Sequence, residues 1–324
     1  MKSINISRES LEDLYKKDKL STYEIAEEFG CCQATIWKRL VEFDIKRRKP
    51  HELNSNVPTK EKLIELYFNK RLSTWRIEKE YGYSRGTIYR KLKEFGLKTR
   101  DLADSHIIYP RQNFSGDPIE KAYLIGFRIG DLGVRKIYPN SKTICVASGS
   151  TIKEQIDLIK SLFEKYGKTW IQTKNGKINI QINLNESFEF LLSKDVPKWA
   201  LDKEDYFFSF LAGFTDAEGS FYISKGMAAY SIGNCDFNLL SIIKKNLNRF
   251  GISCGRISTH KRKGKPTTDG YFFSSDYYQL RIDKKAVLLQ LFTKLKTFIK
   301  HENKMKALNI ATENINWRNL KYGK

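Results

Sequence analysis

The stretch FLAGFTDAEGSF, residues 210–221, decides the fold. Among its apolar residues, Gly213 and Ala217 are four positions apart and therefore lie on one face of a helix. Small residues at this spacing let two helix backbones approach closely. Glu218 falls where the helix is expected to end, just before Gly219, although the helix dipole favours cations at a C-terminus. The pattern predicts a buried helix that carries an acid at its end.

An earlier stretch, YLIGFRIGDLG at residues 123–133, has the same layout. Gly126 and Gly130 are four positions apart, and Asp131 falls at the place of Glu218. Two such helices can pack about a local two-fold axis, which would bring their terminal acids together. Two close carboxylates repel each other unless a cation lies between them. Oxygen ligands suit Mg²⁺, and a pair of acids with bound metal is typical of phosphodiester cleavage.

With these two motifs the sequence resembles the LAGLIDADG homing endonucleases over roughly residues 117–311. LAGFTDAEG at 211–219 is the specific motif, and residues 124–132 form a looser first copy. Two copies imply the single-chain form, and hence a monomer. The resemblance implies an α+β fold with a pseudo-symmetric core, in which each half runs αββαββα and the two sheets form a saddle over double-stranded DNA.

The resemblance also implies the site and the reaction. Asp131 and Glu218 would be the catalytic metal ligands, with the preceding residues Gly130 and Ala217 in the same metal site. The expected ion is Mg²⁺, with Mn²⁺ as the alternative. The implied activity is that of a metal-dependent endodeoxyribonuclease that cuts both strands at a specific sequence. Asp216 lies on a different helical face from Glu218, so we expect it to matter less.

The first motif departs from the family pattern at two positions. Ile129 stands where many members carry an acid, and Leu132 stands where the final glycine belongs. Relatives also carry supporting lysines after each motif, but the matching positions here fall near Gly149 and Cys235. Candidate substitutes, which the sequence does not assign, are Lys225, Lys300 and Lys304. These features favour one alternative, a DNA-binding transcription regulator on an inactive scaffold, whereas the two acids oppose it.

Composition points to a polyanionic partner. The net charge is +21 in 324 residues, spread along the chain, and 13% of residues are aromatic. Basic and aromatic residues together suit contact with nucleic acid, here double-stranded DNA. Intron RNA is the alternative partner, and an RNA-binding maturase the corresponding alternative function.

Other classes of protein are disfavoured. No run of 18 apolar residues predicts a transmembrane helix, so no membrane partner is expected. The first residues lack a signal-peptide core, and the five cysteines and four histidines show no zinc spacing. We therefore expect a cytoplasmic protein with reduced cysteines.

An internal repeat with an offset of 52 opens the chain. LEDLY at 11–15 recurs as LIELY at 63–67, and LST at 20–22 recurs at 72–74. Each copy reads as three helices, with a Ser21–Glu24 capping box in the first and a glycine, Gly30 or Gly82, before the third helix. This is the helix-turn-helix layout, and it resembles the homeodomain-like modules of resolvases and sigma-type regulators. The N-terminal region is thus expected to be all-α.

Several side chains are predicted to contact DNA. On the third helices, roughly 33–43 and 85–95, these are Gln33, Thr35, Lys38, Arg39, Arg85, Thr87, Arg90 and Lys91. On an alternating strand of the first core half they are Lys177, Asn179, Gln181 and Asn183. In the second half, where strands are expected near 255–262 and 271–282, they are Lys225, Arg256, Ser258, His260, Arg262 and Lys263, the last two in a basic loop.

The expected organisation has seven segments. They are the first helix-turn-helix module at 1–50, the second at 51–101, a linker at 102–117, the first core half at 118–193, a linker at 194–204, the second core half at 205–311 and a fraying C-terminal tail at 312–324.

Overall fold

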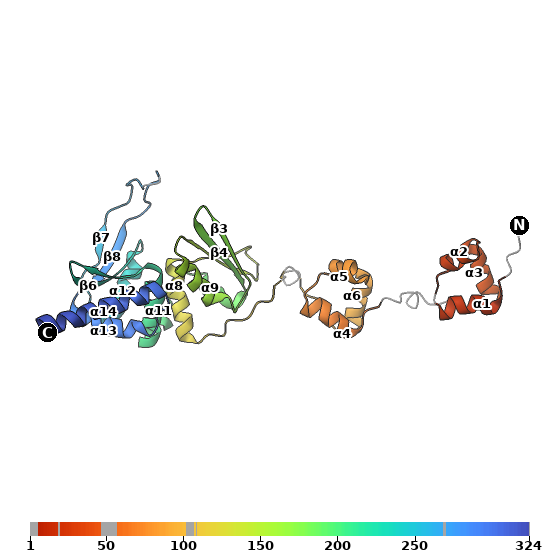
Figure 1. Ribbon diagram of the computed structural model, residues 1–324, viewed down its shortest axis with the longest axis horizontal. Helices are drawn as coiled ribbons and strands as arrows, with labels where there is room; N and C mark the ends of the chain where they lie inside the picture. The colour runs from red at the N-terminus through yellow and green to blue at the C-terminus, as the bar shows by residue number, and fades with distance from the viewer. Residues whose placement is uncertain are drawn as a thin grey trace. The chain divides into compact units, whose positions relative to one another are not determined.

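The computed structural model describes residues 6–18, 20–46, 57–101, 107, 109–267 and 270–323. The chain divides into two compact units, residues 1–108 and residues 109–324 (Figure 1). The expected boundary between residues 50 and 51 lies outside the described residues. So do residues 102–106 and 108 of the expected linker at 102–117. The other expected boundaries stay predictions, apart from the C-terminal one discussed below.

The first unit contains two small helical modules of the same design. The first has α1 Arg8–Glu12, continued by the π-helical η1 Asp13–Lys17, then α2 Thr22–Glu28 and α3 Gln33–Glu42. The second has α4 Lys60–Leu63, the π-helical η2 Ile64–Asn69, α5 Thr74–Tyr81 and α6 Arg85–Glu94. Each module has its own apolar core, which includes Ile25 and Ile36 in the first and Ile77 and Ile88 in the second. The all-α N-terminal region is therefore confirmed, while its DNA binding stays a prediction.

Local chemistry explains why these helices begin and end where they do. Ser21 Oγ accepts the Glu24 amide at 3.2 Å, and Glu24 Oε2 accepts the Ser21 amide at 2.6 Å, which completes the predicted capping box. Gly30 and Gly82 have φ values of +62° and +74°, and residues with a side chain rarely adopt such values. The repeat thus places the same turn before α3 and α6.

The second unit consists of two halves with the same order of elements. The first half has α8 Pro118–Gly130, β1 Gly133–Lys136, β2 Ile144–Ser150, α9 Lys153–Phe163, β3 Thr169–Lys174, β4 Lys177–Leu184 and the 3₁₀ helix η3 Glu186–Leu191. The second half has α10 Trp199–Asp202, α11 Glu204–Glu218, β5 Ser220–Ser224, β6 Met227–Asn234, α12 Phe237–Arg249, β7 Ser258–His260, β8 Tyr277–Ile282, α13 Lys285–Lys296 and α14 Glu302–Tyr322.

Both halves form antiparallel four-stranded sheets with equivalent strand orders, β1-β2-β4-β3 and β5-β6-β8-β7. In Figure 1 the strands extend from a layer of helices that includes α8, α11, α13 and α14. Buried residues of both halves form one continuous apolar cluster. The predicted pseudo-symmetric α+β core is thereby confirmed. None of the described helices is long and apolar enough to cross a bilayer.

Two expectations about the second half are wrong. Strands were expected over 255–262 and 271–282, but β7 spans only Ser258–His260 and β8 only Tyr277–Ile282. The C-terminal tail at 312–324 was expected to fray, but α14 continues to Tyr322. The added turns are stable because Ile315 is fully buried and Asn314 binds the backbone of Ala228 and Gly226 in the β5–β6 hairpin.

Candidate active site

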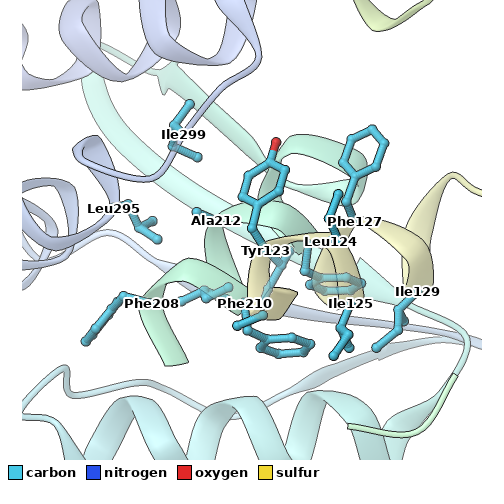
Figure 2. Packing of buried hydrophobic residues seen from close by; sticks show 14 of the residues in the cluster. Tyr123, Leu124, Ile125, Phe127, Ile129, Phe208, Phe210, Ala212, Leu295 and Ile299 are labelled. Carbon is cyan, nitrogen blue, oxygen red and sulfur yellow. The ribbon is translucent and has the colours of Figure 1, made fainter. Parts of the chain in front are cut away.

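Helices α8 and α11 pack with their backbones in contact, as the small-residue spacing predicts. A Cβ atom at Gly126 would clash with the carbonyl oxygen of Phe210, and one at Gly213 would clash with the carbonyl oxygen of Tyr123. Large apolar side chains surround this contact and fix it in the centre of the core (Figure 2). The two helices can therefore end side by side.

The acids lie at these ends. Asp131 is the C-cap of α8, and Glu218 is the last residue of α11. A Cβ atom at Gly130 would clash with that of Ala217 and lie 2.9 Å from Glu218 Cγ, so the two ends are in close contact. The local structure thus brings together the two predicted catalytic acids and the residues that precede them.

The electrostatics of this pair are unfavourable for two free carboxylates. Burial, and secondly the charge of Glu218, raise the pKa of Asp131 to about 6. Burial also raises the pKa of Glu218, against the opposing effects of Lys304 and Lys194. Helix C-terminal carbonyls add further negative potential at this place. A site of this kind favours a bound cation.

The donor set fits a hard divalent ion. Within the described part of the chain, no three His, Cys, Asp or Glu side chains cluster as a metal site, so the acid pair supplies two carboxylates. Mg²⁺ accepts one or two carboxylates and retains several waters, which matches such a set. Gln155 Nε2 donates a hydrogen bond to Asp131 Oδ2, which orients that carboxylate and was missed from the sequence.

Two lysines have charges that act on Glu218: Lys304, one of the three sequence candidates, and Lys194, which was not among them. Lys304, on the first turn of α14, donates to the carbonyl oxygen of Gly219. Burial lowers its pKa, while Asp216, Asp131 and Glu218 oppose that effect. Lys194 lines a pocket of about 440 Å³ together with Glu218 and Cys235. Lys194 was missed because no local sequence signal points to it, and the sequence could not single out Lys304 among its candidates because Lys304 lies 86 positions beyond Glu218.

The other two lysine candidates lie elsewhere. Lys225 is exposed in the β5–β6 turn with a φ of +51°. The Lys300 ammonium group lies 4.5 Å from the centroid of the Tyr123 ring.

The two residues of the first motif that depart from the family pattern have roles in packing. Ile129 and Leu132 are buried in the core. Arg128 donates from Nε to the carbonyl of Leu191 at 2.8 Å and from Nη1 to that of Leu132 at 2.5 Å. The chain after Asp131 is therefore held by the Arg128 side chain, a contact that does not need the family glycine.

The expectation that Asp216 matters less than Glu218 for cleavage stays a prediction, but the structure gives Asp216 a part in packing. Its side chain is fully buried, and its Oδ2 accepts hydrogen bonds from the Tyr123 hydroxyl at 2.6 Å and the backbone amides of Lys300 at 2.8 Å and His301 at 3.1 Å. Helical spacing correctly places it on another face from Glu218, but that face is the interior of the core.

The predicted contacts on the third helices of the modules fall into two groups. Lys38, Arg85 and Arg90 are exposed, whereas Gln33, Thr35, Arg39 and Lys91 are partly covered. The prediction that Thr87 contacts DNA needs correction. The Thr87 side chain is buried and bonds to Ser84, the N-cap residue of α6. Gln33 bonds to Thr22 at 3.0 Å, and Arg39 pairs with Glu42 at 2.9 Å.

The residues predicted from the sequence to contact DNA did not include two exposed aromatic residues on these helices. Trp37 of α3 and Tyr89 of α6 occupy the same position of the repeat, and 38% and 52% of their surfaces are exposed. The repeat alignment could have revealed them, because each follows the apolar stripe by one residue.

The predicted face of the first sheet exists. Lys177, Asn179 and Gln181 are exposed and Asn183 is partly covered, while the alternating isoleucines Ile180 and Ile182 are buried. Trp170 and Gln172 of β3 lie opposite Gln181 and Asn179 in register and share this face. Those two were missed because the β3 segment has no clean alternation.

The corresponding face of the second sheet is only partly as predicted. Ser258 and His260 lie on it, opposite Gln279 and Tyr277 of β8. The prediction that Arg256 lies on this face needs correction. Because β7 is shorter than expected, Arg256 precedes the strand and lines a pocket together with residues of α12.

The basic loop beyond β7 is held by an acid. The amides of Arg262 and Lys263 both donate to Asp276 Oδ1, at 2.9 Å and 3.0 Å. Their side chains remain exposed, and the Arg262 guanidinium lies 4.8 Å from the centroid of the Tyr277 ring. The loop therefore presents two cations from a fixed backbone.

Comparison with known proteins supports the motif assignment. Residues 205–295 match the family model described as LAGLIDADG-like domain. A search of curated proteins found no match to this chain. The family model confirms the resemblance in the second half of the core and does not extend to the N-terminal modules.

Three solved structures illustrate the structural neighbours. Mesophilic variants of the homing endonuclease I-DmoI are similar to this chain at 19% identity and a TM-score of 0.42, over 60% of this chain and 98% of theirs. The homing endonuclease I-WcaI bound to its DNA recognition sequence is similar at 15% identity and a TM-score of 0.42, over 58% and 86%. The LAGLIDADG meganuclease I-AabMI bound to uncleaved DNA is similar at 13% identity and a TM-score of 0.40, over 64% and 92%.

Proposed function

We propose, from the premise that residues 205–295 form a LAGLIDADG-like domain, that this chain is a homing endonuclease that cuts double-stranded DNA at a specific site. The observation that carries the proposal is the close approach of Asp131 and Glu218 at the joined ends of α8 and α11. Two neighbouring, partly buried carboxylates with raised pKa values favour a divalent cation and are costly without one.

In this proposal Asp131 and Glu218 hold Mg²⁺, with Mn²⁺ as the alternative, and Gly130 and Ala217 permit the approach that brings them together. When bound, the ion would lower the pKa of an attacking water and neutralise charge on the phosphate. Gln155 orients Asp131, and Lys304 and Lys194 add positive charge beside the acids. The exposed polar faces of the two sheets and the basic loop at Arg262 would bind the duplex, mainly through its phosphates.

Cleavage of a selected target tests this function. The protein would first select duplexes from a randomised library, and the enriched sequence would then be placed in a supercoiled plasmid. We expect nicking followed by linearisation with Mg²⁺ or Mn²⁺, and none with chelator. Binding without cleavage under either ion would instead support the regulator, and preference for a structured intron RNA over the duplex would support the maturase.

Removal of residues 1–108 should leave an active core. Residues 109–324 contain their own apolar cluster, and Tyr109 already packs against Trp170 with ring centroids 5.8 Å apart. We expect the shortened protein to fold and to cut the same central sequence, with affinity lowered on the order of 10²-fold because the tethered modules no longer add binding energy. Circular dichroism and duplex titration would measure both effects. A shortened protein without a cooperative unfolding transition would show that the core depends on residues 1–108.

A further inference from the structure

The motif residues Arg128 and Asp216 each bond to the backbone of a helix in their own half of the core: η3 in the first half and the start of α14 in the second. Arg128 donates to the carbonyl of Leu191, the last residue of η3. Asp216 accepts the amides of Lys300 and His301, which lead into α14. A cation thus meets a helical C-terminus and an anion meets a helix N-terminus, the favourable arrangement in both cases. Ile129 occupies the position of Asp216 in the first half, so the first half carries no carboxylate at this position.

Asp216 also joins the two halves. Its Oδ2 accepts the hydroxyl proton of Tyr123, which belongs to α8, in addition to the two amides. Its Oδ1 is buried and has no hydrogen-bond donor among the residues that the structure describes. One carboxylate therefore fixes α8, α11 and the start of α14 relative to each other.

The start of α14 carries the lysine of the acid pair. Lys304 is the third residue of α14, and it donates to the carbonyl of Gly219, immediately after Glu218. Since the amides held by Asp216 lie three and four residues before Lys304, they set the position and the rotation of the first helical turn. The Lys304 side chain is long and flexible, so its ammonium group is held by the carbonyl of Gly219, and the backbone restraint keeps Lys304 within reach of that carbonyl.

We propose that Asp216 is a positioning residue that holds the first turn of α14 against both halves and thereby places Lys304 beside Asp131 and Glu218. This inference rests on the proposed nuclease function, to which it adds the residue that supplies the cation and the residue that places it. Asp216 itself lies in the interior, and comparison of Asp216→Asn with Asp216→Ile separates its hold on α14 from the effect of its charge on Lys304.

Variants at position 216 separate placement from packing. Asp216→Asn keeps a side-chain oxygen that can accept both amides, whereas Asp216→Ile introduces the residue of the first half and accepts nothing. Thr215→Val is the matched control, because Thr215 is equally buried on α11 but bonds to the Tyr230 hydroxyl, at 2.7 Å. Should the isoleucine variant lack a cooperative unfolding transition, Asp216→Ser replaces it, since one hydroxyl cannot span three donors.

The first measurement uses metal-free protein. Hydrogen exchange would follow the amides of Lys300 and His301, and reductive methylation read by mass spectrometry would follow Lys304, with Lys306 as the exposed reference. We expect exchange and Lys304 methylation in Asp216→Ile to rise at least about tenfold, while Asp216→Asn and Thr215→Val stay within about threefold of the parent. Parent-like values in Asp216→Ile would overturn the placement of Lys304 by Asp216.

The second measurement follows cleavage and duplex binding separately. We expect Asp216→Ile to lower the single-turnover cleavage rate at least about tenfold with the duplex Kd changed less than about threefold, and Lys304→Met to lower the rate at least as much. The double variant Asp216→Ile/Lys304→Met should be no slower than Lys304→Met alone, because both changes remove one effect. Additive losses, or a parent-like rate in Asp216→Ile, would contradict the proposal. If the parent cuts no selected duplex, the nuclease function fails, and the metal-free measurement still decides whether Asp216 places Lys304.

Discussion

Asp131→Asn and Glu218→Gln should each slow cleavage of at least one DNA strand by about 10²–10³-fold or more, the magnitude expected for loss of one electrostatic group in an active site. Each change keeps the shape of the side chain and removes a charge from the pair at the ends of α8 and α11. Duplex affinity without metal should be kept or increased, because a negative charge facing phosphate has been removed. Plasmid nicking and linearisation measure the two strands separately.

Folding stability provides a second test of the same variants. The pKa of Asp131 rises from 3.8 to about 6 in the folded protein, so at neutral pH its ionisation costs the folded state more than the unfolded state. This cost is present above the folded pKa and disappears as the pH falls towards the unfolded value. We therefore expect metal-free Asp131→Asn to be at least as stable as the parent at pH 7, so that lost cleavage does not reflect unfolding.

With a divalent metal ion added, we expect the parent protein to become more stable than either acid variant. An ion that binds the folded protein alone raises its unfolding midpoint, and the rise should be large in the parent and small in either acid variant. Asp205→Asn is a suitable control, since Asp205 is an exposed acid on the first turn of α11. If both acid variants cut as fast as the parent and still show the full metal-induced stabilisation, the acid pair is not the metal site.

Gly213→Val should destabilise the core by more than about 3 kcal/mol, at or beyond the upper end of ordinary overpacking, because the obstacle is backbone. A Cβ atom at Gly213 would collide with the carbonyl of Tyr123 and come within 2.9 Å of the Phe127 amide nitrogen. Gly126 faces Phe210 in the same way, so Gly126→Val should have a similar effect. The two helices would have to separate, which would also part the acids at their ends.

Denaturant unfolding of residues 109–324 would measure this loss. Gly255→Ala is the control in the same unit, because its added Cβ would meet nothing within 4 Å and its φ is not in the left-handed region. Near-equal unfolding midpoints for Gly213→Val and Gly255→Ala would show that close backbone contact does not hold the halves together.

The sequence by itself determined the features that depend on local spacing. Residues four positions apart share a helical face, which identified α8 and α11, their glycines and the acids that end them. Alternation predicted the exposed residues of β4, and the 52-residue repeat predicted two helical modules with glycine turns. These inferences succeeded because the decisive contacts lie within one element or between two similar ones.

Only the tertiary structure decided which distant groups meet at the acids. Lys304 reaches Gly219 from a helix that starts 83 residues after it, and Gln155 reaches Asp131 from α9. The importance of Asp216 likewise depends on three donors from α8 and the start of α14. No helical or strand period links such residues, because their contacts follow from how the elements pack. The sequence thus specified the two carboxylates, whereas packing selected the cations and the supporting contacts around them.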